Sequence, residues 1–211
     1  MKGFNSLYEK YGLSFDQTYQ DICLLLDLPE VRPETLHEKS KWAMSEIEGI
    51  CGGRFVFYGG GKVTFKTENA EYSANSMAEG FRKAGILSRL LETGAIQPGV
   101  SGPLFWDEPE SNLNPKLMKL LVQILLELSR NGQQIILATH DYVLLKWFDL
   151  LMDKGKDDHV RFHSLYHDPE TYEIKVASTE DYLKITPNPI DEAFGFLINQ
   201  EIENSMGGLG K

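Results

Sequence analysis

Apolar residues follow two spacings along this chain, and the order of the two spacings outlines an α/β domain. Helical spacing, with apolar residues three or four apart, covers residues 14–28, about 33–48, 76–92, 115–129, 141–151 and about 190–203. Short runs rich in β-branched and aromatic residues cover 54–58, 62–66, 104–106, 134–138, 160–166 and 172–176. Because a strand, a helix and a second strand follow one another between residues 104 and 138, we expect a parallel strand pair joined by a right-handed crossover.

The first half of this pattern predicts a helical segment followed by a β-hairpin. Pro29 and Pro33 separate two helical stretches, which we interpret as a helical lobe over residues 1–52, ahead of an α/β domain over residues 53–211. The strands at 54–58 and 62–66, joined through the glycines at 59–61, predict the hairpin. This glycine turn is not a phosphate-binding loop, because Val56 and Val63 stand where such a loop needs glycine and serine or threonine.

Composition limits the classes of protein that the chain can belong to. The 211 residues are 42% hydrophobic, enough for a sizeable core, and the first residues lack the apolar core of a signal peptide. Cys23 and Cys51 have no metal-binding spacing and no run approaches the length of a membrane span, so we expect a soluble protein of the reducing cytoplasm. The net charge of −10 disfavours a broad nucleic-acid-binding face, although a partner could supply a basic one.

Candidate chemistry begins where the apolar run at 104–106 ends. Asp107 and Glu108 follow the run directly, and Pro109 stops the strand, so the two acids should stand at the carboxyl end of a buried strand. Such a pair can divide its work: Asp107 binds the water shell of Mg²⁺, and Glu108 orients or deprotonates an attacking water. The simpler alternative is a strand that ends in a solvated acidic turn.

Two other segments offer groups suited to a phosphate. His140 comes just after the apolar run at 134–138, where it could donate a hydrogen bond to a phosphate oxygen. The small-residue turn at Ala78-Glu79-Gly80 opens a helix, and the amides and the positive dipole end of a helix start attract anions.

In this order and spacing, residues 76–83, 107–115 and 138–140 resemble the signature motif, the Walker B motif with its D-loop, and the switch histidine of ABC-type ATPases. The resemblance is to the branch that contains the SMC, RecF and OLD-like proteins and bacterial AAA-labelled ATPases, and it covers roughly residues 53–151. It implies an α/β fold, a partial P-loop NTPase similar to an ABC ATPase head, with a mainly parallel sheet, a β-hairpin and the N-terminal helical lobe. It also implies Mg²⁺-ATP held between two such heads.

The resemblance assigns roles to individual residues. It implies catalytic roles for Glu108 and His140 and a metal-binding role for Asp107. It implies nucleotide contacts for Ala78, Glu79, Gly80, Arg82, Asn112 and Asn114. Ala78 replaces the serine of the family, so the amide of Gly80 and the helix end would have to suffice there. Arg82 could add a positive charge, although a solvated surface arginine is the commoner case.

The phosphate-binding half of the family pattern is not found in this sequence. A glycine-rich Walker A loop and a glutamine loop are needed to hold the β- and γ-phosphates, and neither motif occurs here. The chain could be the carboxyl half of a gene-split or truncated ATPase, a remnant that no longer hydrolyses ATP, or a binding module that reuses the scaffold. We favour the first, because a drifted remnant is not expected to keep Asp107, Glu108 and His140 together.

The expected function is therefore ATP binding and hydrolysis, with ATP and Mg²⁺ as cofactors, provided that preceding sequence or a partner chain supplies the Walker A. The resemblance implies a homodimer or heterodimer through the ATP site, coupled to DNA metabolism or phage defence, with DNA reached through a partner and no membrane contact. The alternative is a non-hydrolysing module whose sheet and final helix bind a partner protein. ATP turnover measured together with co-purifying chains would separate the two.

Overall fold

The computed structural model describes residues 16–58 and 62–207 of the chain. The chain divides into two compact units, one up to Leu137 and one from Ala138 onward, and each is described by itself. The glycine turn that the sequence predicts at residues 59–61 lies outside the described residues.

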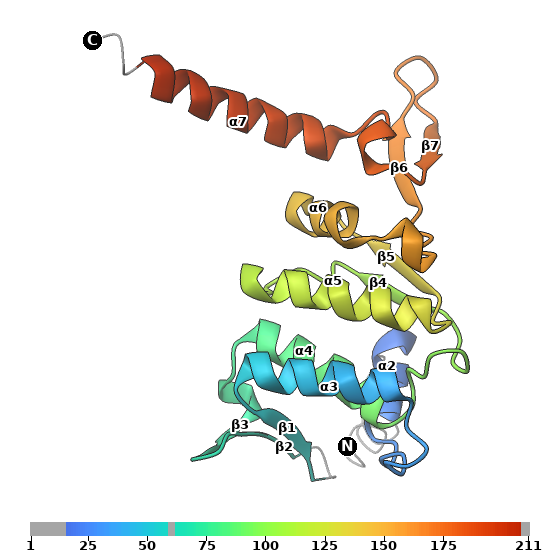
Figure 1. The fold of residues 1–211 in the computed structure, drawn as a ribbon, viewed down its shortest axis with the longest axis vertical. Helices are drawn as coiled ribbons and strands as arrows, with labels where there is room; N and C mark the ends of the chain where they lie inside the picture. The colour runs from blue at the N-terminus through green and yellow to red at the C-terminus, as the bar shows by residue number, and fades with distance from the viewer. Residues whose placement is uncertain (1–15, 59–61, 208–211) are drawn as a thin grey trace. The chain divides into compact units, whose positions relative to one another are not determined.

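Four helices build the core of the first unit (Figure 1). They are α2 (Gln17–Leu26), α3 (Glu38–Cys51), α4 (Glu79–Glu92) and α5 (Pro115–Arg130). α3 packs against α4 and α5, and α2 packs against α4. The apolar face of α5 is the centre of this core, since Ile124, Leu125 and Leu128 are at most 1% exposed.

Local signals set where these helices begin and end. Asn114 caps α5 by accepting a hydrogen bond from the Lys116 amide at 3.0 Å. The helix expected from about residue 33 begins later, at Glu38, because His37 acts as its cap: Nδ1 accepts from the Lys39 amide at 3.1 Å. It also runs beyond the expected end at residue 48, to Cys51, where Gly52 closes it in the left-handed conformation at φ 69°.

An antiparallel sheet of three strands lies beside the helices of this unit. The strands are β1 (Arg54–Phe57), β2 (Val63–Lys66) and β3 (Glu71–Ser73), with β2 in the middle. The predicted hairpin β1–β2 is confirmed, with Phe55 opposite Phe65. The ring centroids of these two residues lie 5.0 Å apart and Phe65 is 6.2 Å from Phe81 of α4, so aromatic side chains fasten the sheet to the helix.

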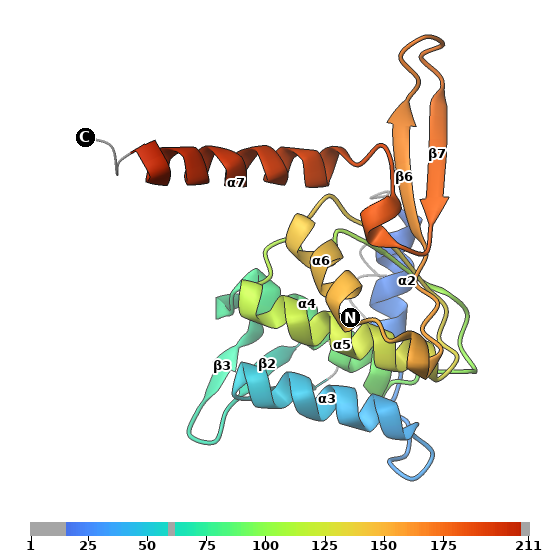
Figure 2. The same ribbon diagram turned by 45° about the horizontal axis from the view of Figure 1, so that its top comes forward.

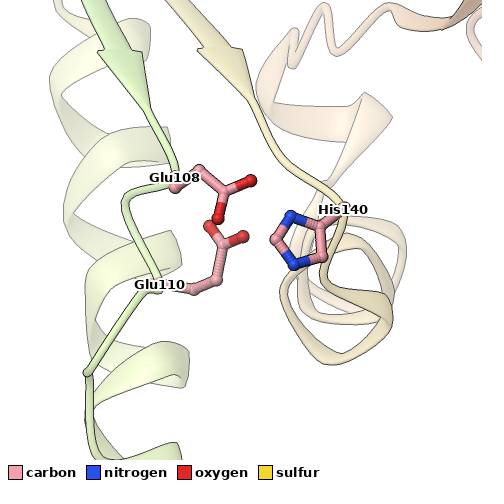
Figure 3. Close-up of side chains that lie close together, drawn as sticks. All are labelled: Glu108, Glu110 and His140. Atoms are coloured by element: carbon pink, nitrogen blue, oxygen red, sulfur yellow. The ribbon is translucent and has the colours of Figure 1, made fainter.

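The second pair of strands in this unit carries the candidate chemistry. β4 (Leu104–Asp107) pairs with β5 (Ile135–Ala138), and α5 connects them. The Leu104 amide donates to the Gln134 carbonyl at 2.9 Å, and the two strands run in the same direction (Figure 3). The expectation of a buried strand is wrong for β4, whose four residues are half-buried or exposed. Phe105 of β4 is 68% exposed, and Ile136 of β5 is 44% exposed. The described residues leave the face with Phe105 exposed, while Trp106 on the other face lines a pocket together with Leu117 and Leu121 of α5.

The second unit consists of a helix, a hairpin and a long final helix (Figure 2). Its elements are α6 (Tyr142–Leu151), the antiparallel strands β6 (Phe162–His167) and β7 (Ile174–Thr179), and α7 (Pro189–Gly207). Short 3₁₀ turns occupy Lys154–Lys156 and Tyr182–Lys184 of this unit, and another occupies Ala74–Ser76 of the first unit. Tyr182 is 2% exposed, and its ring lies 5.4 Å from that of Phe162, which holds the base of the hairpin.

The architecture is mixed α/β and contains the expected parallel strand–helix–strand unit; the described residues also form one antiparallel sheet in each of the two units. The division at Leu137 differs from the boundary expected at residue 52, because α2 and α3 pack within the first unit. A separate helical lobe over residues 1–52 therefore stays a proposal based on sequence order. Across residues 16–58 and 62–207, no helix combines the length and apolar character needed to cross a membrane.

Candidate functional site

The acidic pair lies where the sequence predicts it, at the carboxyl end of β4. Asp107 is the last residue of the strand and is exposed, and Glu108 is half-buried. Glu108 has a φ of 48°, in the left-handed region, where a residue with a side chain is disfavoured by roughly 1–2 kcal/mol. Glycine would avoid this strain. A carboxylate held in a conformation that suits glycine is typical of a functional position.

The turn after β4 carries a second glutamate. Pro109 and Glu110 are buried, the latter with 5% of its surface exposed. Carboxylate oxygens of Glu108 and Glu110 lie within 4.8 Å of one another (Figure 3). The backbone bends back on itself twice, since the Ser111 amide donates to the Glu108 carbonyl at 3.1 Å and the Leu113 amide donates to the Glu110 carbonyl at 2.8 Å. Glu110 is therefore inside the protein, while a solvated acidic turn stays the alternative for Asp107 and Glu108.

The two asparagines expected to contact nucleotide lie on this same turn. Asn112 is exposed and has a φ of 60°, a conformation that asparagine tolerates better than most residues. The Asn114 side chain already accepts the hydrogen bond that caps α5. Helix capping is thus a sufficient structural role for Asn114, and a nucleotide contact for either residue stays a prediction.

The structure brings the start of α4 onto the acidic turn. Ala78 is the N-cap of α4, and its side chain supplies no capping hydrogen bond. Gly80 is buried against the turn so closely that a Cβ atom there would lie 2.6 Å from the Asn112 carbonyl oxygen and 3.1 Å from the Leu113 Cα. The segments that resemble the signature motif and the D-loop are therefore in direct contact within the first unit.

Lys83 strengthens this contact, although the sequence pattern did not single it out. Its Nζ donates to the Glu108 carbonyl at 3.0 Å and to the Ser111 hydroxyl at 2.8 Å. Lys83 follows Gly80 by three residues, so both lie on the same side of α4, and this spacing is the signal that could have identified it. Glu79 and Arg82 are exposed, and their roles stay predictions.

His140 follows the end of β5 by two residues and belongs to the second unit. It is exposed, and the residue after it, Asp141, caps α6 by accepting from the Leu144 amide at 2.6 Å. The expectation that His140 serves the same site as Glu108 rests on the order of the strands along the chain, and it stays a prediction.

A protein-family model matches this part of the chain. Residues 64–146 match the family described as "AAA domain, putative AbiEii toxin, Type IV TA system". The matched segment includes the turn at Gly80, the acidic pair and His140. The match agrees with the resemblance of these motifs to bacterial AAA-labelled ATPases, and it supports a nucleotide-binding, ATPase-like domain. No curated protein sequence matches the chain.

Several solved structures of SMC heads are similar to this chain. One, described as "Structural biochemistry of ATP-driven dimerization and DNA stimulated activation of SMC ATPases", is 16% identical with a TM-score of 0.49, over 78% of this chain and 92% of that chain. The SMC head domain from Thermotoga maritima is 16% identical with a TM-score of 0.48, over 76% of this chain and 51% of that chain. A Pyrococcus furiosus Smc head bound to the C-terminal domain of ScpA is 13% identical with a TM-score of 0.46, over 80% of this chain and 38% of that chain. The chain thus spans about half or less of these last two heads.

Proposed function

We propose that this chain binds and hydrolyses ATP as the Walker B and signature half of an ABC-type ATPase head, together with a Walker A supplied by further sequence or by a partner chain. The observation that carries the proposal is the acidic pair at the end of β4, where Glu108 is held in left-handed backbone. Gly80 and Lys83 of α4 seat the signature-like turn directly on this segment. The family-model match over residues 64–146 supports the same class of protein.

The residues at the end of β4 fit Mg²⁺ as a cofactor. Mg²⁺ prefers hard oxygen ligands and keeps several of its waters, and the exposed carboxylate of Asp107 suits an ion that is bound through its water shell. When bound, the ion would neutralise charge on the phosphate oxygens. Asp107 is therefore the proposed metal-binding residue.

Glu108 and His140 take the proposed catalytic roles. The strained backbone and the hydrogen bond from Lys83 to its carbonyl hold Glu108 in place, which suits a base that must orient a water and accept its proton. His140 would donate a hydrogen bond to a phosphate oxygen. Ala78 offers no side-chain acceptor to the first amides of α4, so these amides could donate hydrogen bonds to an anionic ligand.

We further propose that two such heads enclose the nucleotide. One similar structure is described in terms of ATP-driven dimerization and DNA-stimulated activation of SMC ATPases. The uncovered face of β4 and β5, with Phe105 68% exposed, suits coverage by the segment that brings the Walker A, because parallel sheets are normally covered on both faces. The proposed setting is DNA metabolism or phage defence in the cytoplasm, where the free Cys23 and Cys51 would stay reduced.

The test is ATP turnover of this chain, alone and together with a chain that carries a Walker A. The isolated chain should bind ATP only at about millimolar concentration or above and show no turnover, because the carboxylates at the end of β4 repel a triphosphate. Adding the Walker A chain should restore both binding and turnover. Calorimetry that finds micromolar Mg²⁺-ATP binding to the isolated chain would overturn the split-site proposal.

Three variants of the complete assembly separate the proposed roles. Glu108→Gln should keep Mg²⁺-ATP binding and slow turnover by about 10²-fold or more, the usual scale for loss of a general base. Asp107→Asn should weaken metal-dependent binding itself, and His140→Ala should spare binding and lower turnover. Equal and mild effects of all three would favour the acidic-turn alternative.

A further inference from the structure

The last two-thirds of α7 are exposed, in contrast to the start of the helix. The helix is anchored at its start, where Asn188 caps it through the Asp191 amide at 3.2 Å and Phe194 stacks on Tyr142 of α6 with ring centroids 4.3 Å apart. From Phe196 to Met206 every residue is exposed. A helix of this length without tertiary packing is only marginally stable in water.

This exposed stretch is rich in large apolar side chains. The exposed fractions are 69% for Phe196, 60% for Leu197, 44% for Ile198, 49% for Ile202 and 68% for Met206. Ile198, Ile202 and Met206 are spaced four residues apart and continue the line that Phe194 begins, so they form a stripe along one side of the helix. A stripe of this kind is the surface that an amphipathic helix places into an apolar groove.

Charge decides which partner fits the stripe. α7 contains Asp191, Glu192, Glu201 and Glu203 and no lysine or arginine, and the chain as a whole has a net charge of −10. Two copies of α7 laid side by side would bring these carboxylates together. Nucleic acid and anionic membranes would be repelled for the same reason. A protein groove with lysine and arginine along its rim is complementary.

We propose that α7 from Phe196 to Met206 is a docking helix, which inserts Ile198, Ile202 and Met206 into an apolar groove of a partner protein whose rim is basic. Burial of the stripe supplies the affinity, and Glu201 and Glu203 supply the orientation. This interaction is independent of ATP binding, since α7 lies outside the residues proposed for the ATP site.

A defined probe for this chemistry is a synthetic amphipathic helical peptide of leucine and lysine, compared with a peptide in which glutamate replaces each lysine. Fluorescence anisotropy with the full 211-residue chain should show binding of the lysine peptide, which weakens as salt is added, and no binding of the glutamate peptide. The double variant Ile198→Ser/Ile202→Ser should weaken binding by about tenfold or more, because two apolar side chains lose their burial. Glu201→Lys/Glu203→Lys should reverse the preference between the peptides.

Phe196→Ser is the matched control, because Phe196 is equally apolar and exposed but lies on the side of the helix away from the stripe. It should change the affinity by less than about twofold. Equal losses for this control and for the stripe variant would overturn the proposal, as would binding of the glutamate peptide. So would sedimentation that shows a dimer of the wild-type chain which the stripe variant abolishes, because the occupant would then be a second copy. A photo-reactive residue at position 202 would identify the natural partner, and that purified protein must show the same dependence on the stripe and on the two glutamates.

Discussion

Replacing Gly80 by alanine should push α4 away from the turn that carries Glu108. The added Cβ would lie 2.6 Å from the Asn112 carbonyl oxygen and 3.1 Å from the Leu113 Cα, whereas ordinary contacts begin at 3.4 Å. Both neighbouring atoms belong to the backbone, so no side-chain rotation can relieve the contact. Overpacking of this kind lowers the free energy of unfolding by about 1–3 kcal/mol, and the better helix propensity of alanine offsets less than about 1 kcal/mol of that loss. The net loss in the free energy of unfolding should be about 1–2 kcal/mol.

Gly49→Ala is the matched control for this variant. Gly49 is exposed near the end of α3, and a Cβ atom there would meet nothing within 4 Å. The same substitution should therefore stabilise the protein, by roughly 0.5–1 kcal/mol. Equilibrium unfolding in urea, followed by circular dichroism, should move the midpoints of the two variants in opposite directions from that of the wild-type chain.

The reasoning would be refuted if Gly80→Ala were as stable as Gly49→Ala. The predicted clash also has a functional consequence, because the displaced turn carries the proposed base. In the complete ATPase assembly, Gly80→Ala should lower turnover while Gly49→Ala should leave it unchanged. Equal turnover of the two variants would show that the contact between α4 and this turn does not position Glu108.

Three further outcomes are expected from other parts of the first unit. Arg89→Met removes a guanidinium that donates hydrogen bonds to two backbone carbonyls and two carboxylates, on a side chain that is only 7% exposed. Urea unfolding should show that the free energy of unfolding falls by about 2–4 kcal/mol. A fall of less than about 1 kcal/mol would contradict a stabilising role for this network. Glu108→Gly relieves the left-handed strain, so its free energy of unfolding should be about 1 kcal/mol higher than that of Glu108→Gln, although both should slow turnover by about 10²-fold or more. Burial raises the pKa of the Cys51 thiol from 9.0 to about 11, so in a Cys23→Ser background its alkylation at pH 8 should be about 100-fold slower in the folded than in the urea-unfolded chain. Because the folded chain holds the Cys51 thiol in its neutral form, the stability that this thiol contributes is complete below pH 9 and is lost as the pH rises toward 11. Equal alkylation rates in the folded and unfolded chains would contradict the burial of Cys51.

Most helices and strands could be predicted because their signals are local. Asn114 and Pro115 begin α5, and Asp141 caps α6, all within a few residues of the apolar pattern that defines each helix. β3 was missed because it has three residues, all of them exposed, so it has no apolar pattern to read. The late start of α3 was missed because a histidine cap is not among the usual signals.

The candidate site divides in the same way. That Asp107 and Glu108 stand at the end of a strand follows from an apolar run, two acids and a proline in succession. The sequence does not predict that Gly80 lies against Asn112 or that Lys83 donates to the Glu108 carbonyl. Residues 25 or more positions apart meet only through tertiary packing. The left-handed backbone of Glu108 was also unexpected, since local preference assigns that conformation to glycine or asparagine.

By itself, the sequence determined the order of helices and strands, the position of the acidic pair and the resemblance to ABC-type ATPases, because each depends on neighbouring residues. The tertiary structure decided which apolar residues are covered. Phe105 of β4 and Ile202 of α7 belong to patterns that the sequence makes apolar, yet 68% and 49% of their surfaces are exposed. An apolar pattern states that burial would be favourable, but only the packing of distant segments determines whether this chain supplies the covering surface.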